Sequence, residues 1–554
     1  MMKDYKSFHE KRLNCRGAER EMRKIPITMA TQHPDSASKF VSVNEEVGEA
    51  IDCLKRKNGL RCDEYMVDYM SKLTPYHQLG KIILRVIDET DLIPGKDVFI
   101  TPRMVSSFYE EPFRQLMTLL AVIEAIYHSI QRYDVQGIVE IVQAMTETVD
   151  ELKKCKERCD DFYRIIKKEL RIAKEGELRL IPLFEGIAQH LSIPLIVEQY
   201  ISRTGVKDYM RIFIGKSETA MLSGHPASIL SCKIALAHCY RIQEESGLEV
   251  FPILGGGALP FRGHFTLENS NIFLNEYRGT KTYTIQSGMR YDHGKDETIK
   301  LIEKLKEATN KKPLEFDEGE KKDIVLSLLI FAKHYLKELQ DIIEEVIIIS
   351  NFVPNQRERL LGYQDVSYYR ELRNIKNIAN VCHDKQIKRE ILGLDLDKFL
   401  KLPRAIKLSA ALYSSGLPPE FIGTGNALLE IKERLGNKWL EELLEDIMPS
   451  LRTDIKFASK YFSGNYLLTK RISESVENLK AFFEFNDPDE RHEALVDMTT
   501  FYLKNIKNGK RSAMPKKFAI QIANDEISEY LGGSIESNLE KLILDMGKIR
   551  NSLG

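Results

Sequence analysis

The chain has 554 residues, of which 43% are hydrophobic and 29% charged, enough to bury a sizeable core. Its 81 Lys and Arg residues are balanced by 82 Asp and Glu residues, which excludes a global field attracting nucleic acid or an anionic membrane. Any preference for an anion must therefore be local. The first 25 residues lack the apolar segment of a signal peptide, and no apolar run is long enough to span a bilayer. We therefore expect a cytoplasmic protein with no nucleic-acid or membrane partner.

The eight cysteines include no CxxC pair, which argues against a disulfide framework or a zinc finger. Cys155 and Cys159 lie four residues apart in a charged helical pattern. They could form half of a metal site, but no second Cys or His pair follows at a suitable spacing. The alternative, a pair of reduced thiols on the surface of a helix, is the one we expect.

The first polar motif is IPITMATQHPDSAS, at residues 25–38. Pro34 disfavours helix at His33 and presents this side chain in an extended turn. The histidine is either a general acid or base or a structural residue. Residues 43–92 and 111–176 show helical patterns, separated by a short predicted strand that ends at Arg103.

Two apolar runs, at residues 178–184 and 210–214, predict strands. Each leads to a carboxylate, Glu185 or Glu218, and then to a new helical pattern. In a barrel of parallel strands the loops that follow the strands converge at one end, which carries the chemistry. Two neighbouring carboxylates suit a hard cation such as Mg²⁺. The alternative is a pair of solvated loop acids.

Two further predicted strands also lead to arginines. Residues 250–254 are followed by three glycines and Arg262, and residues 281–292 read as a strand ending in Arg290. Because arginine binds phosphate and carboxylate bidentately, the strand-exit arginines and carboxylates together indicate a metal site facing a small anionic substrate.

Six motifs are spread over almost the whole chain: TQHPD (31–35), IPLFEG (181–186), GKSETAMLSG (215–224), FRG (261–263), TIQSGMRYD (284–292) and LPRAIKLSAALYSSGLPPEFIGTG (402–425). Combined, they resemble the phosphoenolpyruvate carboxylase family, and its short, archaeal-type branch fits best.

The resemblance implies an α/β fold, a TIM-type β/α barrel with extensive additional α-helices and a predominantly helical composition. Residues 1–554 would form a single domain, with barrel strands mainly within 25–300 and a mostly helical part at about 317–554. It also implies a homotetramer that converts phosphoenolpyruvate and bicarbonate to oxaloacetate and phosphate, through carboxyphosphate and the pyruvate enolate, with Mg²⁺ or Mn²⁺ as cofactor.

Carried over by position, the resemblance assigns the site residues. The expected catalytic residues are His33, Arg103, Arg262 and Arg404; the expected substrate-binding residues are Arg290 and either Arg357 or Arg359, between which the spacing does not decide; and the expected metal ligands are Glu185 and Glu218. Asn551 matches an asparagine that binds the inhibitor aspartate in the family. Lys460 lies near the position of a family lysine at that site, or is a solvated helix lysine.

Some positions depart from the family pattern. Glu218 stands where Asp is usual, and Met221 replaces a lysine common in the longer branch. The second glycine-arginine segment of that branch is missing after Arg262. Two alternatives stay open: another barrel lyase or phosphotransferase acting on phosphoenolpyruvate or pyruvate, and an inactive helical scaffold.

Overall fold

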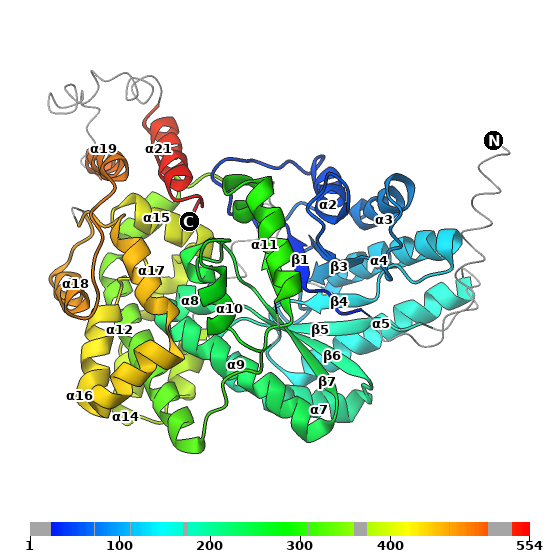
Figure 1. The fold of residues 1–554 in the computed structure, drawn as a ribbon, viewed down its shortest axis with the longest axis horizontal. Helices are drawn as coiled ribbons and strands as arrows, with labels where there is room; N and C mark the ends of the chain where they lie inside the picture. The colour runs from blue at the N-terminus through cyan, green and yellow to red at the C-terminus, as the bar shows by residue number, and fades with distance from the viewer. Residues whose placement is uncertain are drawn as a thin grey trace.

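The structure is a computed structural model that describes residues 24–70, 72–110, 112–169, 176–308, 311–358, 374–464, 466–507 and 534–554. Figure 1 shows the strands gathered on one side of the molecule, while the helices after residue 318 pack together on the other. The two parts meet along helices that follow the middle strands of the sheet.

The sheet is a closed barrel in which each strand pairs in parallel with the next in chain order and the last pairs with the first. Its strands are β1 (Thr28–Thr31), β2 (Glu64–Asp68), β3 (Phe99–Met104), β4 (Glu140–Gln143), β5 (Arg179–Phe184), β6 (Tyr209–Ile214), β7 (Glu249–Leu254) and β8 (Thr282–Ile285). The expected TIM-type barrel is confirmed.

Most described residues outside the barrel are helical, as expected. In chain order the helices are α2 (Glu46–Leu54), α3 (Gln78–Glu89), α4 (Pro112–Tyr133), α5 (Val149–Glu169), α6 (Ile187–Leu191), α7 (Ile193–Thr204), α8 (Ser217–Ser223), α9 (His225–Ser246), the 3₁₀ turn η1 (Pro260–Arg262), α10 (Ser270–Glu276), the π turn η2 (Gly288–Asp292), α11 (Lys295–Glu307), α12 (Glu318–Ser350), α14 (Lys385–Leu392), η3 (Leu396–Lys401), α15 (Ala405–Ser414), α16 (Thr424–Glu442), η4 (Leu443–Ile447), α17 (Ser450–Ser459), α18 (Lys470–Phe482), α19 (Glu490–Lys507) and α21 (Ile535–Ile549).

Three of the eight strands were not expected from the sequence. β2 interrupts the predicted helical region 43–92, β4 interrupts the predicted helical region 111–176, and β1 forms the start of what was described as a polar loop. These strands have four or five residues and are buried throughout. Such short apolar runs cannot be told from buried helix by periodicity.

The barrel interior is filled by side chains rather than open. At the N-terminal end Arg211 of β6 donates to Glu64 of β2 (2.7 Å) and Glu140 of β4 (3.0 Å), and to the Thr282 hydroxyl of β8 (3.1 Å). These four residues come from alternate strands, the usual composition of a layer in such a barrel. An apolar layer that includes Met29, Ile181 and Ile253 packs inside the barrel as well. The filled N-terminal half leaves the C-terminal end for a site.

The helical part shares its core with the barrel. Residues of α8 and α9 belong to the same buried apolar cluster as α12, α15 and α16. The long helix α12 begins with a capping box in which Asp317 accepts from the Glu320 backbone and Glu320 accepts from that of Asp317. This helix opens the part of the chain that was expected to be mostly helical from about residue 317. That residues 1–554 form a single domain stays a prediction.

Two other expectations concern cysteines and membranes. The described cysteines are free thiols, but Cys155 and Cys159 are buried in α5, so their expected place on the helix surface was wrong. Their side of α5 packs against the barrel core because it is the apolar side. In the described part of the chain, no helix is long and apolar enough to cross a bilayer.

Candidate active site

The residues predicted for catalysis and metal binding come from different strands but share one end of the barrel. His33 lies two residues after β1, Arg103 lies near the end of β3, and Glu185 directly follows β5. Glu218 lies in the first turn of α8, after β6, and Arg262 lies in η1, after β7. Because all eight strands are parallel, these positions all lie at the C-terminal end.

His33 is held as a neutral imidazole. Its Nδ1 lies 2.8 Å from the Thr31 hydroxyl, which fixes the ring and leaves Nε2 for other contacts. Burial lowers the pKa of His33 well below its usual value, and the charges of Arg262, Arg103 and Lys72 lower it further. His33 therefore has a proton-accepting nitrogen at neutral pH, and it lies within the field of three cations.

Among these cations, Arg103 is fixed by a carboxylate on the neighbouring strand. Asp68, the last residue of β2, accepts from Arg103 Nε (3.0 Å) and Nη2 (2.7 Å). The same carboxylate accepts from Lys72 Nζ at 3.0 Å. Burial lowers the pKa of Lys72 to about 8, although the charge of Asp68 acts to raise it. One carboxylate therefore orients two cations.

Arg262 is fixed on the other side of His33. Its Nη1 donates to the Gln286 side chain and lies 3.7 Å from Asp35 Oδ2. Gly257 allows this arrangement, because a Cβ there would lie 2.3 Å from Gln286 Oε1. Burial lowers the pKa of Arg262 to about 10, with Asp35 opposing and Arg103 adding to the shift, so the guanidinium stays charged at neutral pH.

The balance of charge around His33 is positive. Arg103, Lys72 and Arg262 are cationic, whereas Asp68 is the carboxylate that pairs with two of them. Burial raises the pKa of Asp35, which weakens its charge as a counter-ion. Before the nearby Glu185 and Glu218 carboxylates are counted, a small anion at His33 would meet more positive than negative charge.

Glu185 and Glu218 lie on neighbouring chain segments. β5 and β6 pair beside the two sites, through Phe184 and Ile214, and the Thr219 hydroxyl donates to the Glu185 carbonyl at 3.1 Å. Glu185 accepts from the Met145 N–H at 3.1 Å through Oε2, and its side chain is buried. Glu218 contributes to the field at Arg262. Both carboxylates therefore lie at the same end of the barrel as the cations.

This donor set fits a hard divalent cation that keeps several waters. Among the described residues no cluster of three or more His, Cys, Asp or Glu side chains could enclose a metal. Mg²⁺ is commonly held by one or two carboxylates plus water and substrate oxygens, so two carboxylates are sufficient. A structural zinc site would need four protein ligands, and no group of three or more suitable side chains is found among the described residues.

The structure gives Arg290 and Arg357 a different environment from the one expected. Arg290 lies in η2 rather than at the end of a strand, because β8 stops at Ile285. Arg290 Nη2 lies 3.1 Å from Glu49, and Arg357 donates to Glu46 at 3.1 Å and also to Glu49. Both arginines are thus paired with carboxylates of α2. Arg359 lies outside the described residues.

The remaining predicted residues lie in the helical part. Arg404 is the N-cap residue of α15, which packs against α8 and η1 and so borders the Arg262 turn. Asn551 is exposed in a left-handed conformation (φ 56°) just after α21, and Lys460 is exposed at the end of α17. Both positions adjoin the start of α19, since the Asp489 backbone N–H donates to the Lys460 carbonyl and Arg550, next to Asn551, contacts His492 at 2.9 Å.

Sequence reasoning missed Asp35, Asp68, Lys72 and Gln286. Asp68 and Lys72 could have been found had the EYMVD run been read as a strand, since a carboxylate would then stand at another strand exit. Asp35 lies inside the motif of His33 and was described only as part of a polar loop. The pairing of Gln286 with Arg262 depends on tertiary contacts and leaves no local signal.

Comparison with known proteins decides the family. A family model described as phosphoenolpyruvate carboxylase matches residues 25–554. The chain belongs to the phosphoenolpyruvate carboxylase family. It is therefore related to enzymes of the carboxy-lyase class, and the resemblance that the sequence motifs predicted is confirmed.

Named relatives come from archaea. The chain is 38% identical over 542 residues to a phosphoenolpyruvate carboxylase of Methanosarcina mazei, covering 96% of this chain and 99% of the relative. It is 36% identical over 554 residues to that of Methanopyrus kandleri, with the same coverage. A solved malate synthase of Haloferax volcanii matches with a TM-score of 0.37 and 14% identity, covering 77% of this chain and 99% of that one. At that score we draw no inference from the likeness.

Proposed function

We propose that this protein carboxylates phosphoenolpyruvate with bicarbonate to give oxaloacetate and phosphate, the reaction of its family. The observation that carries the proposal is the neutral His33 set among Arg103, Lys72 and Arg262 at the end of the barrel that also presents Glu185 and Glu218. The cations suit a phosphorylated, carboxylated substrate, and the carboxylates suit a divalent metal.

In the first step, a bicarbonate oxygen attacks the substrate phosphorus and the bond from phosphorus to the enol oxygen breaks. The products are carboxyphosphate and the pyruvate enolate. Arg262, Arg103 and Lys72 would bind the phosphoryl oxygens and hold them in line, since positioning and charge supply most of the catalysis in phosphoryl transfer. Asp68 and Gln286 would keep two of these cations in place.

In the second step, carboxyphosphate loses its proton and splits into CO₂ and phosphate. His33, neutral before the reaction, would accept this proton at Nε2 in the tautomer whose Nδ1–H donates to the Thr31 hydroxyl. The enolate carbon then attacks CO₂ to form oxaloacetate. Burial of this end of the barrel would keep water from protonating the enolate to pyruvate instead.

Glu185 and Glu218 would hold Mg²⁺ or Mn²⁺. Arg404, at the start of α15, would contribute a further positive charge to catalysis. When bound, the metal would stabilise negative charge that develops on the enolate oxygen. The Glu185 side chain is already positioned by the Met145 N–H, which donates to its Oε2. Members of the family generally depend on a divalent metal.

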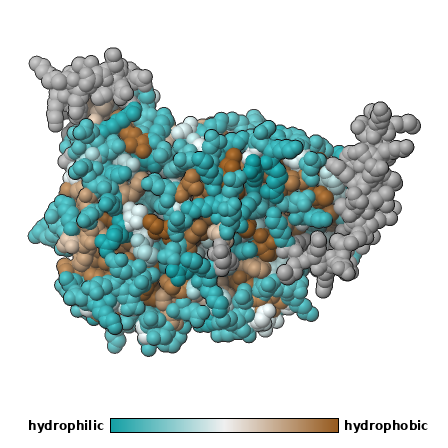
Figure 2. All heavy atoms as spheres, viewed as in Figure 1, coloured by the Kyte–Doolittle hydropathy of each residue, from teal (hydrophilic) through white to brown (hydrophobic). Residues whose placement is uncertain are grey.

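The assembly is part of the proposal. We infer a cytoplasmic homotetramer of single-domain subunits. Supporting it, Phe113, Met117 and Leu120 lie on one face of α4 and are 71%, 57% and 52% exposed. Figure 2 shows brown areas of this kind scattered over a largely hydrophilic face. Light scattering should give four times the monomer mass, and Met117→Glu should lower it if α4 is an interface.

Aspartate inhibition is the last element. Asn551 and Lys460 both adjoin the first turn of α19, so one four-carbon dicarboxylate could reach them. Losing a hydrogen bond to a charged carboxylate costs about 1.5 to 3 kcal/mol, so Asn551→Ala should raise the inhibition constant roughly 10- to 150-fold. Asn551→Gly keeps the left-handed conformation and serves as the matched backbone control. Unchanged inhibition would place aspartate elsewhere.

The proposed reaction has a direct assay. Oxaloacetate is measured by coupled reduction to malate, with and without bicarbonate and Mg²⁺. The proposal predicts oxaloacetate only when both are present. Product that forms without added or dissolved bicarbonate would instead favour another barrel lyase or phosphotransferase acting on phosphoenolpyruvate or pyruvate.

A further inference from the structure

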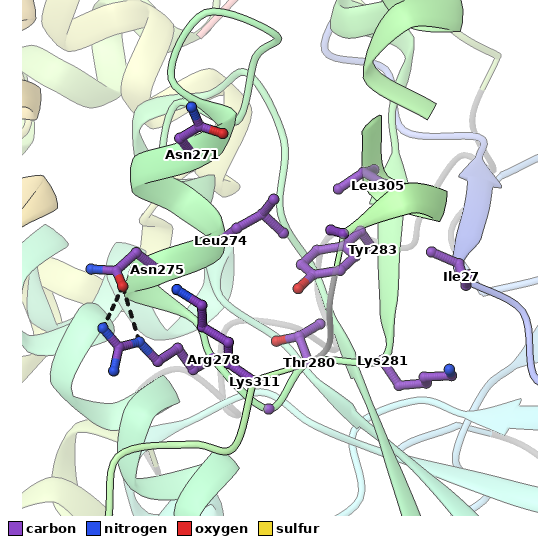
Figure 3. Close-up of a pocket in the computed structure, with 12 residues that line it drawn as sticks. Ile27, Asn271, Leu274, Asn275, Arg278, Thr280, Lys281, Tyr283, Leu305 and Lys311 are labelled. Carbon is purple, nitrogen blue, oxygen red and sulfur yellow. Dashed lines mark hydrogen bonds between the residues drawn. The ribbon is translucent and has the colours of Figure 1, made fainter. Parts of the chain in front are cut away.

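A second pocket lies at the opposite end of the barrel from His33. Its volume is about 340 Å³, within the range of small-molecule sites. It adjoins the starts of β8 and β1 and the end of α11, and is lined by Ile27, Asn271, Leu274, Asn275, Arg278, Gly279, Thr280, Lys281, Tyr283, Leu305, Ala308 and Lys311 (Figure 3). Because Thr282 points into the barrel toward Arg211, its neighbour Tyr283 points outward into this pocket.

The charge of this pocket is one-sided. Arg278, Lys281 and Lys311 line it, and none of its lining residues is an Asp or Glu. In the described part of the chain, no ion pair joins these three cations to a carboxylate. Another surface pocket lies around Arg179 and Lys156. Its lining also includes four acids, Glu157, Asp160, Glu177 and Asp208, which neutralise its cations. Of these two pockets, only the one lined by Arg278, Lys281 and Lys311 offers positive charge that no lining carboxylate compensates.

Two of the cations share one side of the pocket. Asn275 Oδ1 accepts from Arg278 Nε at 3.0 Å and from Nη2, which holds the guanidinium plane and leaves Nη1 as a further donor. Figure 3 shows the Lys311 amine beside this guanidinium, whereas Lys281 extends away on the Ile27 side. An arginine and a lysine side by side match the double charge of a phosphate ester better than the single charge of a carboxylate.

The rest of the pocket is suited to an organic group. Leu274 and Leu305 give it apolar walls, and the Tyr283 ring lies between them in Figure 3. Burial raises the pKa of Tyr283, so its hydroxyl stays protonated and can donate a hydrogen bond. A phosphate group alone would leave this apolar surface unfilled.

We propose that this pocket binds a small organic phosphate, with its phosphate group on Arg278 and Lys311 and its organic part against Leu274, Leu305 and Tyr283. The pocket is separate from the proposed active site, because Lys281 precedes β8 and Gln286 follows it. β8 therefore has the pocket at one end and the partner of Arg262 at the other.

Phenyl phosphate is a suitable probe, because it joins a phosphate dianion to an apolar ring. Its binding is measured by calorimetry on the parent protein and on Arg278→Gln, Lys311→Gln and Arg262→Gln. Loss of a charge-assisted hydrogen bond should raise the dissociation constant about tenfold or more in each of the first two variants. Binding at this pocket should persist in Arg262→Gln. Inorganic phosphate should bind more weakly than phenyl phosphate.

Lys312→Gln is the matched control, since it removes the same charge from the next residue, whose amine lies over the Tyr240 ring instead. It should bind like the parent, and thermal melting should show all variants folded. The proposal is overturned if the parent does not bind phenyl phosphate, if Arg278→Gln and Lys311→Gln bind as the parent does, if Lys312→Gln weakens binding equally, or if binding is lost in Arg262→Gln alone. Carboxylase activity does not enter this test.

Discussion

Two buried arginine clusters lie close to β1 and β8, and they differ in how completely their charges are matched. In the cluster of α2, Arg290 and Arg357 contact Glu46 and Glu49, and the hydroxyls of Tyr65 and Tyr291 also donate to Glu49. In the cluster around His33, Arg103 and Lys72 share one carboxylate, and Arg262 lies beyond hydrogen-bond distance from Asp35.

The carboxylates behave differently as well. Burial acts to raise the pKa of Glu49, but Arg290 and Arg357 outweigh it and lower the pKa to about 2. Burial raises the pKa of Asp35 despite the nearby Arg262. Two arginines thus hold Glu49 charged in the α2 cluster, which is typical of structure, although burial raises the pKa of Glu46 there. In the His33 cluster three cations face Asp68 and the weakened Asp35, which leaves positive charge for a ligand. The position of an arginine after a strand does not distinguish the two clusters, whereas its charged partners do.

The largest effect on activity should come from Arg262. Arg262→Ala removes a cation that would stabilise the transferring phosphoryl group, and such arginines contribute about 10³-fold or more. The turnover number should fall by that amount, measured as oxaloacetate formed per second. Arg262→Lys keeps the charge but loses the bidentate guanidinium, so its turnover number should lie between those of the parent protein and Arg262→Ala. A loss below tenfold in Arg262→Ala would remove this residue from the mechanism.

A change in the other cluster should affect stability instead. Arg357→Met leaves Glu46 and Glu49 buried with fewer partners, which costs about 3 to 5 kcal/mol when one partner of a buried pair is removed. Urea unfolding should show this loss, while the Michaelis constant for phosphoenolpyruvate in the folded protein changes little. The opposite pattern, normal stability with weak substrate binding, would give Arg357 the substrate role that the family resemblance leaves open between Arg357 and Arg359.

The two proposed metal ligands should respond differently to substitution. Glu185→Gln removes a charged ligand and should weaken Mg²⁺ activation by at least about tenfold, the lower bound even for residues that only orient ligands. Glu218→Asp should be tolerated, since Asp is the usual family residue at that position. Titrating activity with Mg²⁺ measures both. An unchanged Mg²⁺ dependence in Glu185→Gln would contradict the assignment.

The smallest effect should be a pH dependence from Lys72. Burial lowers its pKa to about 8, so Lys72 carries its charge below pH 8 and loses it as the pH rises above that value. If Lys72 binds substrate oxygens, the Michaelis constant for phosphoenolpyruvate should rise above pH 8 by up to about tenfold per pH unit. Lys72→Arg keeps its charge throughout and should lack this rise. The same rise in Lys72→Arg would assign it to another group.

The sequence predicted the parts of the site that stand next to long apolar runs. β5, β6 and β7 have six residues each, and Glu185, Glu218 and Arg262, which follow them, lie at one end of the barrel as predicted, while their roles stay predictions. β2 was missed because it is short and buried on both faces, and with it Asp68 and Lys72 were missed. Arg290 was misplaced because TIQSGMRYD reads as one strand, although Gly288 marks the turn where the helix-like segment begins.

The pairing of charges across elements could not be predicted in this way. Glu49 lies in a helix with the ordinary acidic composition of a first turn, and nothing near it in sequence indicates two arginines more than 200 residues away. The same holds for Asp35 and Arg262. Such contacts are set by the closure of β8 against β1, which is a property of the whole barrel.

The central claim is that His33 accepts a proton after phosphoryl transfer has occurred, and His33→Asn tests it most directly. Phosphate and oxaloacetate are measured together from the same reaction, with Thr31→Val as a control for the ring's orientation. The account predicts that oxaloacetate formation falls roughly 10²- to 10⁴-fold, as for a lost general base, while phosphate release falls less. Full retention of oxaloacetate formation in His33→Asn would contradict it.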